Sequence, residues 1–239
     1  MDKQTKEARV YEIFQRISPG YDQANRRISL GMDRSWKRLL TDALVRALPR
    51  EGTLLDVCCG TGDIALDVAR RRPDVMVTGL DGAPAMLSVA ERRRGGLENV
   101  RLTTGNALAL PWPDNSFDAA AVSFGLRNTA DYALALSEMR RVVRPGGLVC
   151  CMDSFVPESA MVKPFYRLYF GHVMPVLGGG VKNRREYRWL YESTEAFLSC
   201  GALAALFRET GLAAVETQKR MLGACALVRG RKIQERQSD

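Results

Sequence analysis

A run of apolar residues that breaks into a glycine turn constrains the fold of this chain more than any other feature. The run and the turn read Leu54-Leu55-Asp56-Val57-Cys58-Cys59-Gly60-Thr61-Gly62-Asp63. An apolar run followed by closely spaced glycines and a helical pattern predicts a buried strand, a tight turn and a helix N-terminus. Gly60 and Gly62 let the backbone turn sharply and leave no side chain between it and a ligand.

Asp81 ends a second apolar run, residues 75–80. A carboxylate at the end of that strand can accept hydrogen bonds from both hydroxyls of a ribose. The helix N-terminus beyond the glycines offers unpaired N–H groups. Together these features predict a pocket for an adenosine-containing cofactor.

Two kinds of cofactor fit the glycine turn. Gly60-x-Gly62-x-x-Ala65 matches the dinucleotide pattern G-x-G-x-x-G/A, so a nicotinamide-dependent oxidoreductase stays open as an alternative. However, Asp56 and Asp63 flank the turn, and their carboxylates would repel a pyrophosphate at the helix N-terminus. S-adenosylmethionine carries a sulfonium and an ammonium group, which carboxylates attract. The sequence therefore favours S-adenosylmethionine.

Strand and helix patterns alternate along the chain, which predicts an α/β fold with a parallel sheet wrapped by helices. The spacing predicts strands at 53–58, 75–80, 100–104, 117–123 and 147–153, and helices at 63–71, 83–94 and 131–143. Two helical patterns, 10–17 and 35–48, precede the sheet and are separated by Pro19-Gly20. A helix at 195–209 and strands near 213–218 and 223–229 are expected to close it.

We expect one domain over residues 1–239. It would comprise an N-terminal helical segment (1–50), a cofactor-binding core (51–155), an acceptor-side insert (156–194) and a C-terminal helix and strands (195–239). Ligands of such sheets bind beyond the carboxyl ends of the strands. That rule gathers residues 59–62, Asp81, 105–107, 123–128 and Asp153 into one crevice. The amide of Asn106 could meet an adenine edge there, and a turn role after Gly105 explains it equally well.

Composition restricts the partners and the location. The net charge is +8, but its basic clusters are scattered, which favours solvated helix ends over nucleic acid or anionic lipid. No stretch approaches the ~20 apolar residues of a membrane-spanning helix. The six cysteines lack C-x-x-C spacing, so we interpret them as core residues in a reducing cytosol and expect no metal site. We expect a cytoplasmic protein without a nucleic-acid partner.

Four segments carry a resemblance to the ubiquinone/menaquinone biosynthesis C-methyltransferases, above all to their bacterial demethylmenaquinone branch. They are Tyr21-Asp22-x-x-Asn25-x-x-Ile28-Ser29-x-Gly31-x-x-x-x-Trp36-Lys37, Asp56-Val57-Cys58-Cys59-Gly60-Thr61-Gly62-Asp63, Phe124-Gly125-Leu126-Arg127-Asn128, and Arg141-Val142-Val143-Arg144-Pro145-Gly146-Gly147. Glycine turns and Pro-Gly-Gly occur in many class I methyltransferases, whereas the first and third segments are specific to this family. The resemblance covers nearly the whole chain.

The resemblance implies a class I, Rossmann-like S-adenosylmethionine-dependent methyltransferase. Its seven-stranded, mostly parallel sheet would have helices on both faces, an N-terminal helical lid and an aromatic-rich insert after the fifth strand. The implied reaction is C-methylation of the ring of a polyprenylated quinol, above all demethylmenaquinol to menaquinol. The family pattern implies that five residues contact the cofactor: Thr61, Asp81, Asn106, Ala107 and Ser123. The glycine turn adds Asp56, Gly60 and Gly62 to the predicted cofactor-binding residues.

By the same resemblance, Arg127 and Asn128 act at the quinol oxygen. A guanidinium cannot readily serve as a base, so we expect Arg127 to stabilise the developing oxyanion while a water takes the proton. A surface ion pair is the alternative for Arg127. Asp153 is a second catalytic candidate, for proton transfer or ring positioning. Here Asp153-Ser154-Phe155 stands where the family usually ends the strand with glutamate, any residue, then serine. The chain also departs from the family pattern at Ala24 and Asp33.

The aromatic insert suits a hydrophobic acceptor. Residues 161–177 could wall an apolar groove for an isoprenoid tail, with Lys163, Arg167 and Lys182 facing lipid phosphates. A helix pair that simply covers the core explains the same pattern equally well. We expect transient contact with the inner face of the membrane, and a homodimer stays open. A methyltransferase for a soluble phenolic metabolite would look the same in its cofactor half.

Overall fold

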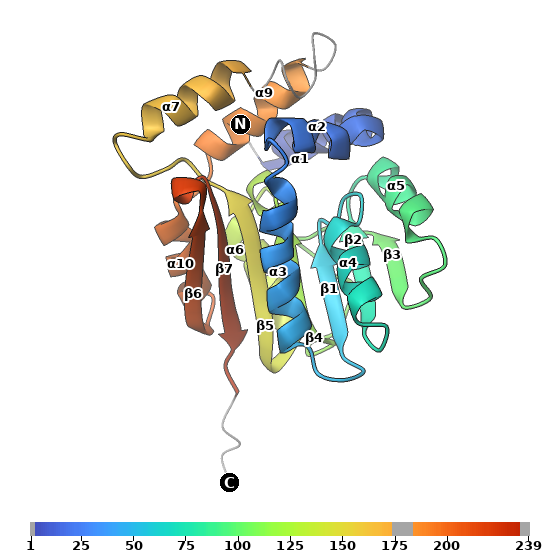
Figure 1. The fold of residues 1–239 in the computed structure, drawn as a ribbon. Coiled ribbons are helices and arrows are strands. Elements are labelled where there is room, and N and C mark those ends of the chain that lie inside the picture. The colour runs from blue at the N-terminus through green and yellow to red at the C-terminus, as the bar shows by residue number, and fades with distance from the viewer. Residues whose placement is uncertain (1–2, 174–183, 235–239) are drawn as a thin grey trace.

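The computed structural model describes residues 3–173 and 184–234, and the strands in these ranges form one sheet (Figure 1). The sheet has seven strands in the order β3-β2-β1-β4-β5-β7-β6. The first five strands pair in parallel, and β7 is antiparallel to both of its neighbours. Their bounds are β1 Thr53–Val57, β2 Met76–Asp81, β3 Val100–Thr104, β4 Phe117–Ser123, β5 Val143–Ser154, β6 Leu212–Arg220 and β7 Cys225–Lys232.

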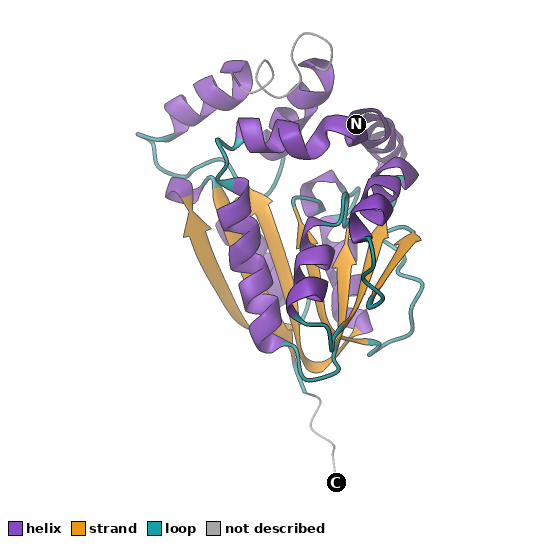
Figure 2. Cartoon of the chain, turned by 45° about the vertical axis from the view of Figure 1, so that its right-hand side comes forward, coloured by secondary structure: helices purple, strands orange, loops and turns teal. Residues whose placement is uncertain are grey.

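Helices cover both faces of this sheet (Figure 2). Helices α3 (Asp33–Ala47) and α4 (Asp63–Arg71) pack on one face, and α6 (Tyr132–Val142) and α10 (Cys200–Glu209) pack on the other. The alternation of strand side chains decides the partners. Leu54 of β1 joins the core under α3 and α4, whereas Leu55 and Val57 join the core under α6 and α10. The predicted class I fold, with helices on both faces, is confirmed.

A layer of helices lies across the carboxyl end of the parallel strands (Figure 1). The N-terminal part of this layer is α1 (Lys3–Ile17), η1 (Ser18–Gly20) and α2 (Tyr21–Ile28). The other part is α7 (Lys163–Leu168), η3 (Tyr169–Val173) and α9 (Arg184–Glu195). Lys6 ties α1 to the segment that follows β4, because its Nζ donates to the carbonyls of Arg127 (3.0 Å) and Thr129 (2.6 Å).

Most predicted elements match the structure, and the main differences lie in the helices. Helix α5 (Pro84–Arg94) and short turns η2 (Leu126–Asn128) and η4 (Met221–Gly223) complete the described elements. The helix predicted at 195–209 is wrong in its first turn: α9 ends at Glu195 and α10 begins at Cys200. Ser199 starts the new helix, since its Oγ accepts a hydrogen bond from the Ala202 N–H at 3.1 Å. The sequence pattern did not predict α2. It also predicted the start of α1 seven residues too late, because residues 3–9 are mostly polar.

Candidate functional site

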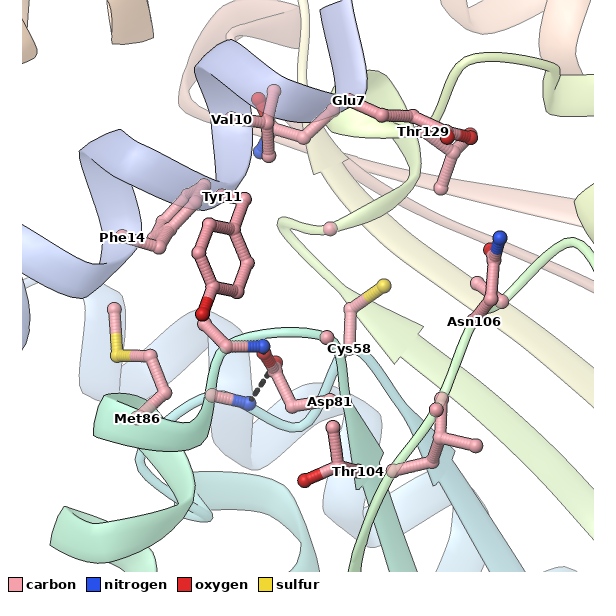
Figure 3. A pocket seen from close by; sticks show the side chains of 18 of the residues that line it. Glu7, Val10, Tyr11, Phe14, Cys58, Asp81, Met86, Thr104, Asn106 and Thr129 are labelled. Carbon is pink, nitrogen blue, oxygen red and sulfur yellow. Dashed lines mark hydrogen bonds between the residues drawn. The ribbon is translucent and has the colours of Figure 1, made fainter. Parts of the chain in front are cut away.

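A cavity of about 410 Å³ opens beyond the carboxyl ends of β1, β2, β3 and β4. Helix α1 crosses above it, so that Val10, Tyr11 and Phe14 face the strand ends from the opposite side (Figure 3). Of the predicted site residues, the following line this cavity: Gly60, Asp81, Asn106, Ala107, Ser123 and Asn128. The strand-end rule therefore correctly predicted that these residues, which lie far apart in the sequence, meet at one cavity.

The backbone around the cavity is bent where two strands end. Cys58, after β1, has φ +54°, and Phe124, after β4, has φ +56°. Both line the cavity, and neither is a glycine, so each sits in a left-handed region that non-glycine residues rarely adopt. Such conformations gather at functional sites, where the surrounding fold maintains them. Gly125 is required beside them, because a Cβ there would lie 2.5 Å from the Cβ of Cys58.

Asp81 is held against the glycine turn. Its Oδ2 accepts a hydrogen bond from the Gly60 N–H and its Oδ1 accepts one from the Ala83 N–H, both at 2.8 Å (Figure 3). Burial raises the pKa of Asp81, and the two N–H donors oppose that rise. Each carboxylate oxygen keeps a second acceptor site, so a ribose hydroxyl can still donate to it.

Two further features suit an adenosine-containing cofactor. The buried Oγ of Ser123 has no hydrogen-bond partner among the described residues, although it lies on the cavity wall. A buried polar group without a partner is unfavourable, so a polar ligand atom there would stabilise it. A Cβ on Gly60 would meet nothing within 4 Å, which leaves the backbone of the turn open to a ligand. The residues present therefore fit the predicted cofactor.

The turn role of Asn106 is confirmed, and its contact with an adenine edge stays a prediction. Asn106 lines the cavity (Figure 3), and its Oδ1 also accepts a hydrogen bond from the Leu108 N–H at 2.9 Å, which makes a local turn.

Three predicted cofactor residues in or near the glycine turn do not line the cavity. Asp56 is buried, and its Oδ2 accepts from the Ala65 N–H at 3.0 Å in the first turn of α4. Gly62 precedes α4 with φ +83°. The hydroxyl of Thr61 donates to Oδ1 of Asp22 at 2.7 Å, so that it ties the turn to α2. Cofactor contact for Asp56, Thr61 and Gly62 stays a prediction.

Asp63 does not present a bare carboxylate to the cavity. It pairs with Lys37 of α3 and with Arg93 of α5, the latter at 2.5 Å. Although burial opposes ionisation, these two cations hold the pKa of Asp63 below its usual value. The argument that Asp63 attracts a cationic cofactor is therefore wrong, because Lys37 and Arg93 already neutralise its charge.

Arg127 and Asp153 form a buried ion pair behind Asn128. Both side chains are almost fully buried, and neither lines the cavity. Asp153 also accepts hydrogen bonds from the N–H groups of Ser154 (2.8 Å) and Arg127 (3.3 Å). The alternative of a surface ion pair for Arg127 is wrong. Asp153 contacts the guanidinium and not the cavity, and the catalytic roles of Arg127, Asn128 and Asp153 stay predictions.

The resemblance implied an N-terminal helical lid, and α1 does cover the cavity, but sequence reasoning named none of the α1 side chains that line it. Val10 and Phe14 were treated only as part of a helical pattern, and their spacing of four residues was the available signal. Glu7 and Tyr11 line the cavity beside them, as does Met86 of α5. A periodicity shows that a helix has an apolar face, but it does not show which surface that face covers.

The described part of the insert lies apart from this cavity. None of residues 161–173 lines it, and residues 174–177 of the predicted groove, like Lys182, fall outside the described residues. Trp189 of α9 reaches the site indirectly, since its Nε1 donates to Oδ1 of Asn128 at 3.3 Å.

Comparison with known proteins agrees with this architecture. The model of the ubiE/COQ5 methyltransferase family matches residues 2–232. A protein of Bacillus licheniformis named demethylmenaquinone methyltransferase is 42% identical over 215 residues, which cover 89% of this chain and 92% of that protein. A Staphylococcus aureus protein of the same name is 40% identical over 235 residues, covering 97% and 96%.

Solved structures of methyltransferases share the fold at low sequence identity. A SAM-dependent methyltransferase from Thermotoga maritima superposes with a TM-score of 0.62 at 21% identity, over 93% of this chain and 99% of that one. Phosphoethanolamine N-methyltransferase 2 of Haemonchus contortus, solved with S-adenosyl-L-methionine, gives 0.60 at 16% identity, over 80% and 51%. Because the family model matches nearly the whole chain, this chain belongs to the ubiE/COQ5 methyltransferase family and is an S-adenosylmethionine-dependent methyltransferase.

Proposed function

We propose that this methyltransferase methylates a ring carbon of a polyprenylated naphthoquinol and so converts demethylmenaquinol to menaquinol. The observation that carries the proposal is the 42% identity, over nine-tenths of both chains, to a relative that bears that activity in its name. A soluble phenolic acceptor would require no membrane, and the experiment below separates it from a quinol.

The lining of the cavity supports two adjacent subsites. Asp81, Gly60 and Ser123 supply polar contacts near the strand ends, where the cofactor is expected. Asn128, Thr129 and Ala130 border the same cavity after β4 and lie next to the buried Arg127. Apolar side chains such as Val10 and Phe14 form much of the remaining wall. A flat aromatic ring fits such a wall, because apolar contact positions it and excludes water.

The chemistry needs an electron-rich ring carbon, which forms when a neighbouring hydroxyl of the quinol loses its proton. S-adenosylmethionine supplies the electrophilic methyl group when it is bound. In our proposal Asn128, which lines the cavity, meets the quinol oxygen, and the buried guanidinium of Arg127 behind it stabilises the negative charge that develops there without contacting the ring. Burial disfavours the charged guanidinium, but Asp153 outweighs that effect and raises the pKa of Arg127. Asp153 thus keeps Arg127 charged and in place.

We further propose that the enzyme works from the cytoplasm, in transient contact with the inner face of the membrane. A long isoprenoid tail keeps the substrate in the bilayer, so the protein must reach it there. Among residues 3–173 and 184–234, no helix is long and apolar enough to cross a membrane. A homodimer stays a prediction.

The test is methyl transfer from methyl-labelled S-adenosylmethionine to chemically reduced demethylmenaquinone in detergent, with the product separated by chromatography. We expect label on the quinol ring. Arg127→Lys, which keeps the charge but not the shape of the guanidinium, should lower the rate while cofactor binding persists. Arg144→Lys is the matched control, since Arg144 forms a half-exposed ion pair with Asp118. Cofactor binding without quinol methylation, together with methylation of a soluble phenol, would overturn the proposal.

A further inference from the structure

Two segments expose large apolar side chains at the same end of the molecule as the cavity. Around α7, Met161 is 83% exposed, Phe165 75% and Leu168 60%. In the turn η4, between β6 and β7, Leu222 is 77% exposed and Met221 41%. Single exposed apolar residues are common, but five of them on adjoining segments form a patch of the kind that marks an interaction site.

The two segments lie against each other. Lys219, at the end of β6, donates to the carboxylate of Glu158, just before α7, at 3.0 Å. A second cavity, of about 220 Å³, is lined by Ser159 from the first segment and Leu222 from the second. Figure 1 shows α7 above the end of β6 where η4 lies, beyond the carboxyl end of the parallel strands. The exposed side chains therefore form one surface.

The local conformation of each segment displays these side chains. Residues 161, 165 and 168 are spaced as one face of a helical turn, whereas Tyr166 on another face is buried. Met221 and Leu222 have φ of +48° and +53°, and Gly223 follows with φ +96°. The left-handed region costs free energy for residues with a Cβ. The fold thus maintains a strained turn whose outer side chain is an exposed leucine, and strain of this kind points to a function.

The charges around the patch are mainly basic. Lys163 and Arg167 lie within α7, and Lys219 and Arg220 end β6 next to η4. The acids Glu195 and Glu158 already pair with Arg167 and Lys219. A second copy of this chain, docked through the same surface, would bring cations against cations, which disfavours a self-association. Anionic lipid headgroups would instead complement them.

We propose that Met161, Phe165, Leu168, Met221 and Leu222 form a docking surface that inserts into the headgroup region of an anionic membrane. Apolar tips surrounded by lysine and arginine are the combination that binds at such an interface. This inference rests on the proposed function for its purpose, because docking there holds the cavity end of the molecule at the bilayer that contains the isoprenoid tail. The binding itself depends only on the surface.

The test is co-sedimentation of the full chain with vesicles of phosphatidylglycerol and phosphatidylcholine. The docking variant is Phe165→Ser with Leu222→Ser. Its matched control is Leu134→Ser with Ile233→Ser, which removes two exposed apolar side chains (44% and 54%) outside the docking surface. We expect the docking variant to partition at least about tenfold less than the wild type, since each lost side chain contributes apolar burial. The control should partition as the wild type does, and vesicles of phosphatidylcholine alone should bind less protein.

Equal partition of the docking variant and the wild type, or an equal loss in the control, would overturn the proposal. A second outcome would also overturn it: the wild-type protein stays in the supernatant and forms a dimer in size-exclusion chromatography, whereas the docking variant is a monomer. In detergent, where docking is not needed, Leu222→Ser alone should methylate demethylmenaquinol at the wild-type rate. If the wild type methylates no quinol in detergent, the proposed function fails, and the vesicle measurement still decides the docking surface.

Discussion

Removing the charge of Asp153 tests whether the buried ion pair holds the site together. The side chain of Asp153 is fully buried and that of Arg127 is 6% exposed, so neither charge can be solvated when its partner is lost. The Nε of Arg127 already has no partner among the described residues. Breaking a pair this deeply buried costs about 3–5 kcal/mol. For a chain of this length that corresponds to a fall in Tm of about 10 °C.

The assay is urea unfolding of a double-mutant cycle made from Asp153→Asn and Arg127→Met. Asparagine keeps the shape of the side chain and can still accept from a backbone N–H, so the lost charge is isolated. We expect the double variant to lose about 2 kcal/mol less stability than the two single variants lose in sum, because the second change removes the uncompensated partner. Glu216→Gln is the control. It breaks the exposed pair with Arg229 and should cost less than about 1 kcal/mol. If Asp153→Asn costs no more than this control, or if the single losses add, the reasoning is wrong.

Three further predictions concern the cofactor, the stability and the turnover. Asp81→Asn should weaken S-adenosylmethionine binding by about tenfold or more in calorimetry, because a charged acceptor is lost, and an unchanged Kd would contradict the predicted ribose contact. Burial raises the pKa of Asp56 to about 8, opposed by the Ala65 N–H. Since the folded pKa exceeds the unfolded one, the contribution of Asp56 to stability is complete below about pH 4 and is lost as the pH rises through 8. The free energy of unfolding in urea should fall less between pH 5 and pH 8.5 for Asp56→Asn than for the wild type. Equal falls would refute this. Trp189→Phe removes the hydrogen bond to Asn128 but keeps an aromatic ring, so kcat should fall by up to about tenfold at an unchanged cofactor Kd; a parallel loss of cofactor affinity would indicate a general structural defect.

The glycine-turn side of the cavity was predictable because its signals are local. The apolar run 54–57, the two glycines and the helix that begins at Asp63 follow one another in the chain, and α4 begins and ends at the residues the sequence predicted. Asp81 was identified from the end of the next strand alone. Parallel strands bring their carboxyl ends to one edge, so the strand-end rule placed Asn106, Ser123 and Asn128 there without knowledge of any contact.

The roles of individual charges were not predictable, because they depend on partners far away in the sequence. Asp63 resembles a cofactor ligand in the sequence, yet Lys37 and Arg93 neutralise it. Thr61 lies in the glycine turn, yet its hydroxyl bonds Asp22 of α2. The division of the chain into four functional segments likewise stays a prediction, since the described contacts do not test it.

The sequence alone determined the order of the strands along the chain, the glycine turn and the acid that follows it. Each of these depends on side chains within a few residues, whose periodicity and backbone preferences act locally. Only the tertiary structure decided which side chains of α1 line the cavity, that Arg127 pairs with Asp153, and that Met221 and Leu222 stand exposed beside α7. Those outcomes arise when segments separated by many residues meet at one edge of the sheet, where burial and charge pairing select among arrangements that the local sequence permits equally.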